Sequence, residues 1–405
     1  MLYRQMPKTG DKLSILGFGC MRLPGGQLNP NEKESINQIR YAIDKGVNYL
    51  DTAWPYHGGR SEVILGKAIK EGYRNKVKIA DKLPHWLCKS HEDMDYYLDA
   101  QLERLDVAVI DYYLIHALDA TSWGKAKNLG VKQFMDKAKE SGKIGNIGFS
   151  FHGPRDDFKT IIDDYDWDFC QIQFNMLDKQ FQAGTEGLNY AAAKNIGVVI
   201  MEPLRGGSLA GKLPHDVTKI YKESLVQRSN AEWALRWVWN HPGVITVLSG
   251  MNTIEQIDEN VNVANQAEIH SLNENELNTI ETAAETFRSL MKVPCTSCQY
   301  CQPCPKNVNI PAAFNYYNDK YLFKKGLMSR SLYLMQLSDI QEKTPGLASQ
   351  CIACGICIKH CPQKIDIPGE LKKVQKEFEG KISTPLLMFM FKNAFTKGRR
   401  KTVAS

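Results

Sequence analysis

The sequence lacks long apolar segments, and we expect no leader at its start. No stretch is long and apolar enough to span a bilayer, so we expect no membrane span. The start, MLYRQMPKTGDKLSILG, lacks the apolar core of a secretory signal peptide. We therefore expect a cytoplasmic protein whose thiols stay reduced and serve as ligands. A Gly-x-Gly-x-x-Gly motif after an early strand is also missing, which argues against an open, doubly wound dinucleotide-binding sheet.

The composition is that of a globular protein, with 43% hydrophobic and 24% charged residues. A length of 405 residues exceeds one ordinary core, so two domains are expected. From Lys292 onward, 18 Lys and Arg outnumber 7 Asp and Glu, although the whole chain carries only +6. This basic region would attract an acidic electron carrier such as ferredoxin or flavodoxin, or it would offset the negative charge of thiolate-ligated clusters. We expect no nucleic-acid partner.

Cysteine is concentrated near the end of the chain: eight of the eleven cysteines follow residue 294. They form two runs, Cys295-x2-Cys298-x2-Cys301-x2-Cys304-Pro305 and Cys351-x2-Cys354-x2-Cys357-x3-Cys361-Pro362. The second run matches the bacterial ferredoxin pattern in full, and the first is one residue shorter in its last gap. The runs predict two 4Fe–4S clusters and therefore redox chemistry. Zinc is the alternative, although four-thiolate zinc sites normally pair two separated Cys-x2-Cys knuckles.

Crossed ligation is typical of proteins with two such clusters, because the fourth cysteine of each run reaches the other cluster. It predicts one cluster on Cys295, Cys298, Cys301 and Cys361. The second cluster would then be held by Cys351, Cys354, Cys357 and Cys304.

Residues from about 13 to 265 alternate between predicted strands and helices. One helix should start at Asn31-x-x-Glu34, a pattern typical of a capping box. Other helices are expected over Glu92–Leu105 and Asn230–Trp239. The eight expected strands are Leu13–Phe18, Val47–Leu50, Val77–Ala80, Asp111–Ile115, Ile144–Phe149, Phe169–Phe174, Val198–Met201 and Ile245–Leu248. This alternation favours a (β/α)8 TIM barrel over the doubly wound alternative.

Three regions follow from these patterns: a barrel over residues 1–290, a ferredoxin-like domain over 291–380 and a tail over 381–405. A helical spacer at 312–344 favours a small α-helical ferredoxin-like domain. The tail contains an apolar run, Pro385–Phe391, and a basic end, Lys397–Lys401. We expect a short helix docked on the barrel or on a partner subunit, or a basic flexible end. An interfacial membrane anchor is the alternative.

Polar side chains stand where barrel strands end, which is where TIM-barrel enzymes place their catalytic groups. The residues at or just past the strand ends are Asp51, Lys82, His116, Ser150 and the apolar Met201, with Tyr56 five residues after Asp51. Reduction of a carbonyl by hydride needs an acid that protonates the nascent alkoxide. A tyrosine serves if a lysine stabilises its phenolate and an aspartate fixes the lysine, and a histidine can orient the substrate oxygen.

The ordered motifs of residues 10–265 resemble the aldo-keto reductase family. They are Leu16-Gly-Phe-Gly-Cys-Met21, Asp51-Thr-Ala-x-x-Tyr56, Ser61-Glu62, Lys82, Leu114-Ile-His116 and Ile147-Gly-Phe-Ser150. With the cysteine runs, the whole chain resembles the ferredoxin-fused branch of microbial aldo/keto reductase-like oxidoreductases. The resemblance implies a (β/α)8 barrel and a catalytic tetrad of Asp51, Tyr56, Lys82 and His116. Tyr56 would be the proton donor.

The resemblance also implies a nicotinamide cofactor, NAD(P)H, lying over the strand ends. The residues it assigns to that cofactor are Gly19, Met21, Ser150, Gln171, Met201, Leu204, Gly206, Gly207, Glu259 and Asn260. Relatives that favour NADP place cations near the positions of Gly250 and Gln256, so strong NADP selectivity is not implied. Arg205 would be free to serve a phosphate.

The sequence thus predicts an oxidoreductase that reduces a small-molecule carbonyl or oxidises an alcohol and is linked to electron transfer through two clusters. Hydride carries two electrons and a cluster one, so direct coupling needs a splitting agent, usually flavin, which is an alternative occupant of the barrel mouth. Two other functions stay open. One is an electron-transfer or docking protein with a vestigial tetrad, and the other is a carbonyl reductase with purely structural clusters.

Overall fold

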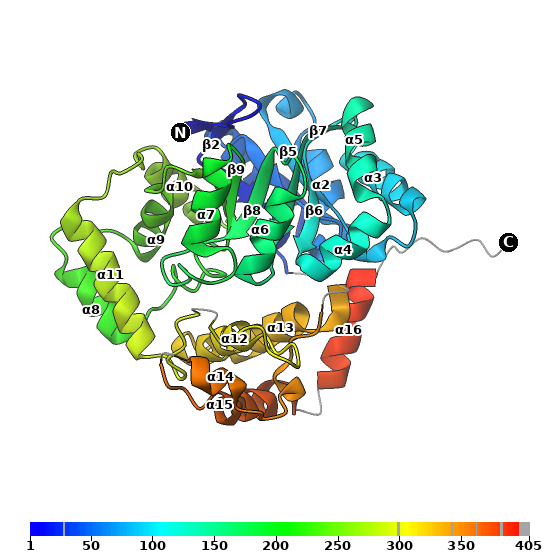
Figure 1. Ribbon diagram of the computed structural model, residues 1–405. Coiled ribbons are helices and arrows are strands. Elements are labelled where there is room, and N and C mark those ends of the chain that lie inside the picture. Colours follow the sequence, from blue (N-terminus) through cyan, green and yellow to red (C-terminus); the bar gives the residue numbers. More distant parts are fainter. Residues whose placement is uncertain (27–28, 298–299, 342–343, 362, 381–383, 397–405) are drawn as a thin grey trace.

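Eight parallel strands close into a barrel in the computed structural model (Figure 1). The structure describes residues 1–26, 29–297, 300–341, 344–361, 363–380 and 384–396. The strand order is β10-β3-β4-β5-β6-β7-β8-β9. The strands are β3 (Leu16–Gly19), β4 (Tyr49–Asp51), β5 (Lys78–Leu83), β6 (Ile110–Leu118), β7 (Ile144–Phe151), β8 (Phe169–Gln173), β9 (Gly197–Met201) and β10 (Val244–Ser249). The predicted barrel is confirmed, and the doubly wound alternative is wrong.

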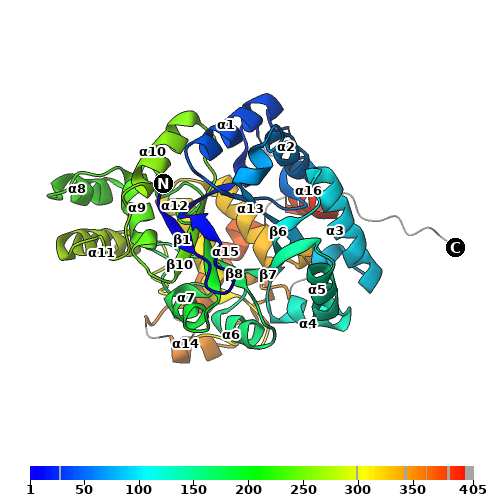
Figure 2. The same cartoon turned by 90° about the horizontal axis from the view of Figure 1, so that it is seen from above.

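Helices alternate with these strands and pack outside the barrel (Figure 2). They are α1 (Glu32–Asp44), α2 (Ser61–Ala68), α3 (His91–Leu105), α4 (Ala120–Asn128), α5 (Val131–Glu140), α6 (Arg155–Asp163), α7 (Gly184–Ala193), α8 (His215–Glu223), α9 (Asn230–Trp239), α10 (Ile254–Ala264) and α11 (Glu274–Ser289). The Asn31 side chain accepts from the Glu34 backbone N–H, as the capping pattern predicts. Burying the apolar stripes of these helices against the strands excludes water from the core.

The first predicted strand is wrong in detail, because the chain turns at Ile15. Residues Tyr3–Gln5 (β1) and Lys12–Ser14 (β2) pair as an antiparallel hairpin, and only the segment from Leu16 joins the barrel. Met6 and Leu13 of this hairpin region are fully buried in the apolar cluster that fills the barrel interior. The hairpin therefore closes the end of the barrel where the strands begin, and a site must lie at the opposite end.

A separate helical unit follows α11. Its helices are α12 (Ile310–Leu322), α13 (Gly326–Leu337), α14 (Ile356–His360), α15 (Ile367–Val374) and α16 (Thr384–Thr396). The unit has its own apolar core, in which Tyr317, Tyr333 and Phe378 pack edge to face. We call this unit the cysteine domain.

The cysteine domain covers the end of the barrel where the strands finish. In Figure 1 the hairpin lies at the top of the molecule and the cysteine domain lies below the barrel, with α12 and α13 facing it. The loops that follow β8 and β9 reach this domain: Phe181 enters its apolar core, and Lys325 donates to Ser208 Oγ at 3.1 Å. Any site at the strand ends is therefore roofed by α12 and α13.

Helix α16 docks within the cysteine domain rather than on the barrel. Leu387, Met388 and Phe391 pack against the core of the cysteine domain, whereas Leu386 and Phe389 are exposed. These contacts make α16 part of the cysteine domain, and the basic end of the tail lies outside the described residues. None of the helices in the described part of the chain has the length and apolar character needed to cross a bilayer.

Candidate functional site

Asp51 and Lys82 form a buried ion pair at the barrel mouth. Asp51 ends β4 and Lys82 lies near the end of the neighbouring strand β5. The Lys82 ammonium donates to both Asp51 oxygens and to the backbone carbonyl of Thr52, each at 2.7 Å. Burial alone would lower the pKa of Lys82, but Asp51 and Tyr56 raise it above its ordinary value. Lys82 is therefore a fixed cation.

Tyr56 stands in the turn after β4, over this cation. Lys82 Nζ lies 5.3 Å from the centroid of the Tyr56 ring, and the ring of His116, from β6, lies 6.1 Å from it edge to face. Burial raises the pKa of Tyr56 to about 12, although the Lys82 ammonium opposes the rise. Tyr56 therefore keeps its proton at neutral pH and is able to donate it. The structure brings together the four residues of the predicted tetrad.

Aromatic rings border the site unequally. The Trp86 ring lies 5.2 Å from the His116 ring, so it borders the same space. Trp54 packs under the Arg104 guanidinium, whose central carbon lies 3.5 Å from the centroid of the Trp54 ring. His57 is buried, and its Nε2 accepts from the Leu23 backbone N–H.

Two buried polar residues lie where nicotinamide is expected. Ser150 is the penultimate residue of β7, and its hydroxyl accepts from the Ala117 backbone N–H at 2.7 Å. Gln171 of β8 is paired with Ser150 in register, and its Nε2 lies 3.7 Å from Met201 Sδ. Gln171 Oε1 is buried and has no partner among the described residues. An amide donor on a ligand would satisfy this oxygen, so the pair fits a carboxamide group.

The other expected cofactor residues surround the same strand ends. Gly19 ends β3 beside Asp51, and Met21 follows it. Leu204, Gly206 and Gly207 lie in the loop after β9, both glycines with positive φ. Glu259 and Asn260 are on α10, where Asn260 donates to Ser249 Oγ at 2.9 Å and so fastens the helix to β10.

Arg205 is not free to serve a phosphate, contrary to the expectation. Its guanidinium is 5% exposed and lies 2.8 Å from Asp178 Oδ1 and 2.9 Å from Asp319 Oδ1 of α12. It also donates to Asn315, one turn before Asp319. The two carboxylates neutralise the charge of Arg205 at the boundary between barrel and cysteine domain, and Asn315 accepts a further hydrogen bond from it.

The described cysteines of the two runs line two neighbouring pockets. One pocket is bordered by Cys304, Cys351, Cys354 and Cys357. The other is bordered by Cys295, Cys301 and Cys361, and Cys301 borders both. Cys298 lies outside the described residues. This division matches the crossed ligand sets, and all described cysteines are free thiols.

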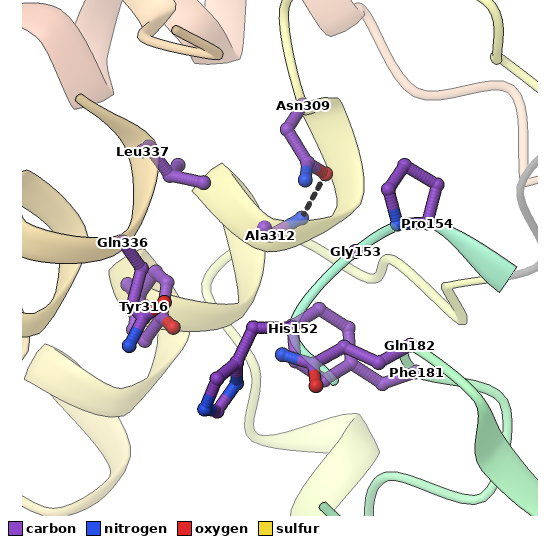
Figure 3. A pocket seen from close by; sticks show the side chains of 10 residues that line it. All are labelled: His152, Gly153, Pro154, Phe181, Gln182, Asn309, Ala312, Tyr316, Gln336 and Leu337. Atoms are coloured by element: carbon purple, nitrogen blue, oxygen red, sulfur yellow. Dashed lines mark hydrogen bonds between the residues drawn. The ribbon is translucent and has the colours of Figure 1, made fainter. Parts of the chain in front are cut away.

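Opposite faces of α12 contact the barrel and a cysteine pocket. Ala312 and Tyr316 line a pocket shared with barrel loops, whereas Ile310, Pro311 and Phe314 border the pocket of Cys295 and Cys361. Figure 3 shows the shared pocket, where Gln182 Oε1 is buried without a partner among the described residues. Its lining residues are His152, Gly153, Pro154, Phe181, Gln182, Asn309, Ala312, Tyr316, Gln336 and Leu337.

Sequence reasoning did not identify α12 as part of the site. The polar pair Asn315 and Asp319, spaced by four residues on a largely apolar helix, was the available signal. Such a pair indicates one polar patch on the helix, but it does not indicate that the partner is Arg205.

The chain matches the aldo/keto reductase family over residues 15–285 and a 4Fe-4S dicluster domain over residues 294–365. It is 28% identical over 287 residues to "Probable aldo-keto reductase 1" of Glycine max, covering 62% of this chain and 81% of the relative. It is 26% identical to the "NADH-specific methylglyoxal reductase" of Escherichia coli, covering 64% of this chain and 91% of the relative.

Among solved structures, the holo form of aldo-keto reductase AKR11C1 from Bacillus halodurans has the same fold, with a TM-score of 0.59 and 24% identity. That match covers 70% of this chain and 96% of the other. The 4Fe-4S match shows that the zinc alternative is wrong. The chain is an oxidoreductase that belongs to the aldo/keto reductase family and carries a 4Fe–4S dicluster domain after the barrel in sequence.

Proposed function

We propose that this chain reduces a small carbonyl compound, or oxidises the corresponding alcohol, with a nicotinamide cofactor at Tyr56, and that two 4Fe–4S clusters exchange electrons with this site. The observation that carries the proposal is the buried Asp51–Lys82 pair held 5.3 Å under the Tyr56 ring and roofed by α12. A relative named "NADH-specific methylglyoxal reductase" supports the same chemistry.

The residues of the site supply the proton side of this reaction. A bound nicotinamide supplies a hydride to the carbonyl carbon. The Tyr56 hydroxyl donates its proton to the carbonyl oxygen. The substrate therefore gains a hydrogen nucleus with two electrons from the hydride and one proton from Tyr56. Lys82 stabilises the phenolate left on Tyr56, and His116 holds the substrate oxygen. Asp51 keeps Lys82 charged.

The same proposal assigns the cofactor residues. Ser150 and Gln171 would hold the nicotinamide carboxamide, with Met201 beside the ring. Gly206 and Gly207 would lie beside the diphosphate, and the open space over Gly207 would let its backbone approach the diphosphate closely. Gly19, Met21, Leu204, Glu259 and Asn260 complete the proposed set at the strand ends.

The cysteine pockets support two clusters with crossed ligation. Cys304, Cys351, Cys354 and Cys357 would hold one cluster. Cys295, Cys301 and Cys361, with Cys298 as the expected fourth ligand, would hold the other. The Ala353 backbone N–H lies 3.4 Å from Cys351 Sγ, an interaction that stabilises a thiolate.

The position of the cysteine pockets supports electron transfer between the clusters and the barrel mouth. Helix α12 is the layer between the pocket of Cys295 and the barrel mouth, and a helix with its side chains is about 10–12 Å across. One-electron and two-electron chemistry would be joined by a flavin at the barrel mouth. An acidic carrier such as ferredoxin or flavodoxin would dock where Cys354 is exposed and the exposed Lys306 borders the same pocket.

A structural role for the clusters is the second candidate. Cysteines from both pockets pack against the core of the cysteine domain, so clusters there would complete that core. In this case the domain, which we place at about residues 291–380, only holds the roof over a carbonyl reductase barrel.

Anaerobic spectroscopy separates the two candidates. The purified holoprotein is titrated with NADH or NADPH, with and without added flavin, while visible absorbance and low-temperature paramagnetic resonance follow the clusters. We expect cluster bleaching only when flavin or substrate is present. Carbonyl turnover without bleaching under any condition would instead support the structural role or an exchange of electrons with a partner alone.

A further inference from the structure

The loop after β9 and the turn after β3 form a small cationic recess. Gly206 and Gly207 of the loop have φ values of +62° and +79°. A Cβ at Gly206 would lie 3.1 Å from Arg22 Nη2, and a Cβ at Gly250 would lie 2.9 Å from Arg22 Cδ. Glycine at these two positions therefore leaves the room that the Arg22 side chain fills. Arg22 occupies the region where the sequence offers no cation at position 250.

A second cation enters this recess from the cysteine domain. Lys325 lies in the turn between α12 and α13, and its ammonium donates to Ser208 Oγ at 3.1 Å. Burial and the nearby Arg22 charge lower the pKa of Lys325. Glu202, whose carboxylate lies 3.9 Å from Arg22 Nη2, offsets part of this positive charge. Two cations facing a glycine turn form a site for an anion.

We propose that Lys325, together with Arg22, binds the diphosphate of the nicotinamide cofactor, so that the cysteine domain completes the cofactor site of the barrel. The inference rests on the proposed function, because it requires a dinucleotide at the barrel mouth. The glycine turn favours the diphosphate over a 2′-phosphate, because the proposed function assigns the backbone of Gly206 and Gly207 to the diphosphate. Arg205, the cation of the loop after β9, forms ion pairs with Asp178 and Asp319 instead.

A consequence follows for capture of the cofactor. Lys325 reaches the recess only while α12 and α13 sit on the barrel, so binding of the dinucleotide and seating of the cysteine domain favour each other. The cofactor would then lie beneath the same helices that border the cysteine pockets.

Equilibrium binding tests the inference without any turnover. Anaerobic holoprotein is titrated with NADH and with NADPH by calorimetry, for the natural chain, Lys325→Met, Lys325→Arg and Lys324→Met. Loss of a charge-assisted contact to phosphate should raise Kd of Lys325→Met roughly 10- to 100-fold, equally for both nucleotides. Lys325→Arg should retain most of the affinity. Lys324→Met removes the same charge from the exposed neighbouring residue and should bind like the natural chain.

Each other outcome has a definite meaning, provided iron content and circular dichroism show intact holoprotein. Equal Kd values for Lys325→Met and Lys324→Met overturn the inference and leave the proposed function standing. A loss confined to NADPH assigns Lys325 to a 2′-phosphate and overturns the diphosphate assignment. If the natural chain binds neither nucleotide, the proposed function fails. Titration with ADP then tests separately whether the recess binds a diphosphate. ADP binding weakened by Lys325→Met supports a diphosphate site, and no ADP binding overturns it.

Discussion

Arg205 of the barrel and Asp319 of α12 meet 2.9 Å apart, at the boundary between the barrel and the cysteine domain. Asp178 lies on the other side of the same guanidinium, so one cation faces two carboxylates. The contact joins the loop that borders the cofactor region to the helix that borders the cysteine pockets. It therefore couples the position of the roof to the conformation of that loop.

The first prediction concerns pH and Asp319. Burial raises the pKa of Asp319 to about 6, although Arg205 opposes the rise. In the unfolded chain an aspartate titrates near about 4. Between these values the folded protein holds a proton that the unfolded chain releases, so this group makes the free energy of unfolding fall as pH rises from about 4 to about 6. Above about pH 6 its contribution is constant.

Urea unfolding of the natural chain and of Asp319→Asn measures this effect, because all other groups cancel in the difference. Relative to the variant, the natural chain should lose stability as the pH rises from about 4 to about 6. A gain of relative stability over the same range would mean that Arg205 dominates and holds the pKa below its ordinary value.

The sequence predicted the barrel and the tetrad because both are local in character. The apolar runs that become strands are short and separated by helical patterns, and Asp51, Lys82 and His116 each follow such a run. Closure of the barrel then brings residues from neighbouring strands together without further information. The prediction of the first strand was wrong because Leu13 and Leu16 are both apolar. Leu13 packs in the closed end of the barrel interior, whereas Leu16 belongs to a barrel strand.

The roof over the barrel was not predictable in the same way. The contacts of Arg205 with Asp319 and of Lys325 with Ser208 join residues more than a hundred positions apart. No periodicity connects them, since they depend on how two separately packed units meet. The basic charge of the cysteine region was visible, but the sequence did not show that one of its lysines turns toward the barrel.

The second prediction concerns the ion pair beneath Tyr56. Asp51→Asn leaves the Lys82 ammonium buried without its counter-charge, and Lys82 is fully buried. Removal of one partner of a buried pair costs about 3–5 kcal/mol. The double variant Asp51→Asn with Lys82→Met removes the stranded charge and should recover much of that loss. Urea midpoints of the three proteins are the measurement, and a double variant less stable than Asp51→Asn would contradict the explanation.

The third prediction concerns the two cysteine pockets. Cys304→Ser should remove the cluster of Cys351, Cys354 and Cys357, even though Cys304 belongs to the other run. Iron analysis should then fall from about eight to about four atoms per chain. Cys88→Ser, a buried cysteine of the barrel, is the control and should leave the iron content unchanged.

Paramagnetic resonance of the reduced proteins shows which cluster is lost. Cys304→Ser and Cys354→Ser should lose the same signal, whereas Cys361→Ser should lose the other. If Cys304→Ser and Cys361→Ser exchanged these signals, each run would hold its own cluster and crossed ligation would be wrong.

The last prediction concerns the proton donor. Tyr56→Phe keeps the ring over Lys82 but removes the only hydroxyl of that residue, so carbonyl reduction should slow by about 10²- to 10⁴-fold. Nucleotide binding should be unchanged, because Ser150 and Gln171 are untouched. Since the pKa of Tyr56 is about 12, the rate of the natural chain should not fall through loss of its proton between about pH 7 and about pH 9. Initial rates with a small aldehyde under anaerobic conditions measure both effects. Turnover by Tyr56→Phe at the rate of the natural chain would place the proton donor elsewhere in the barrel mouth.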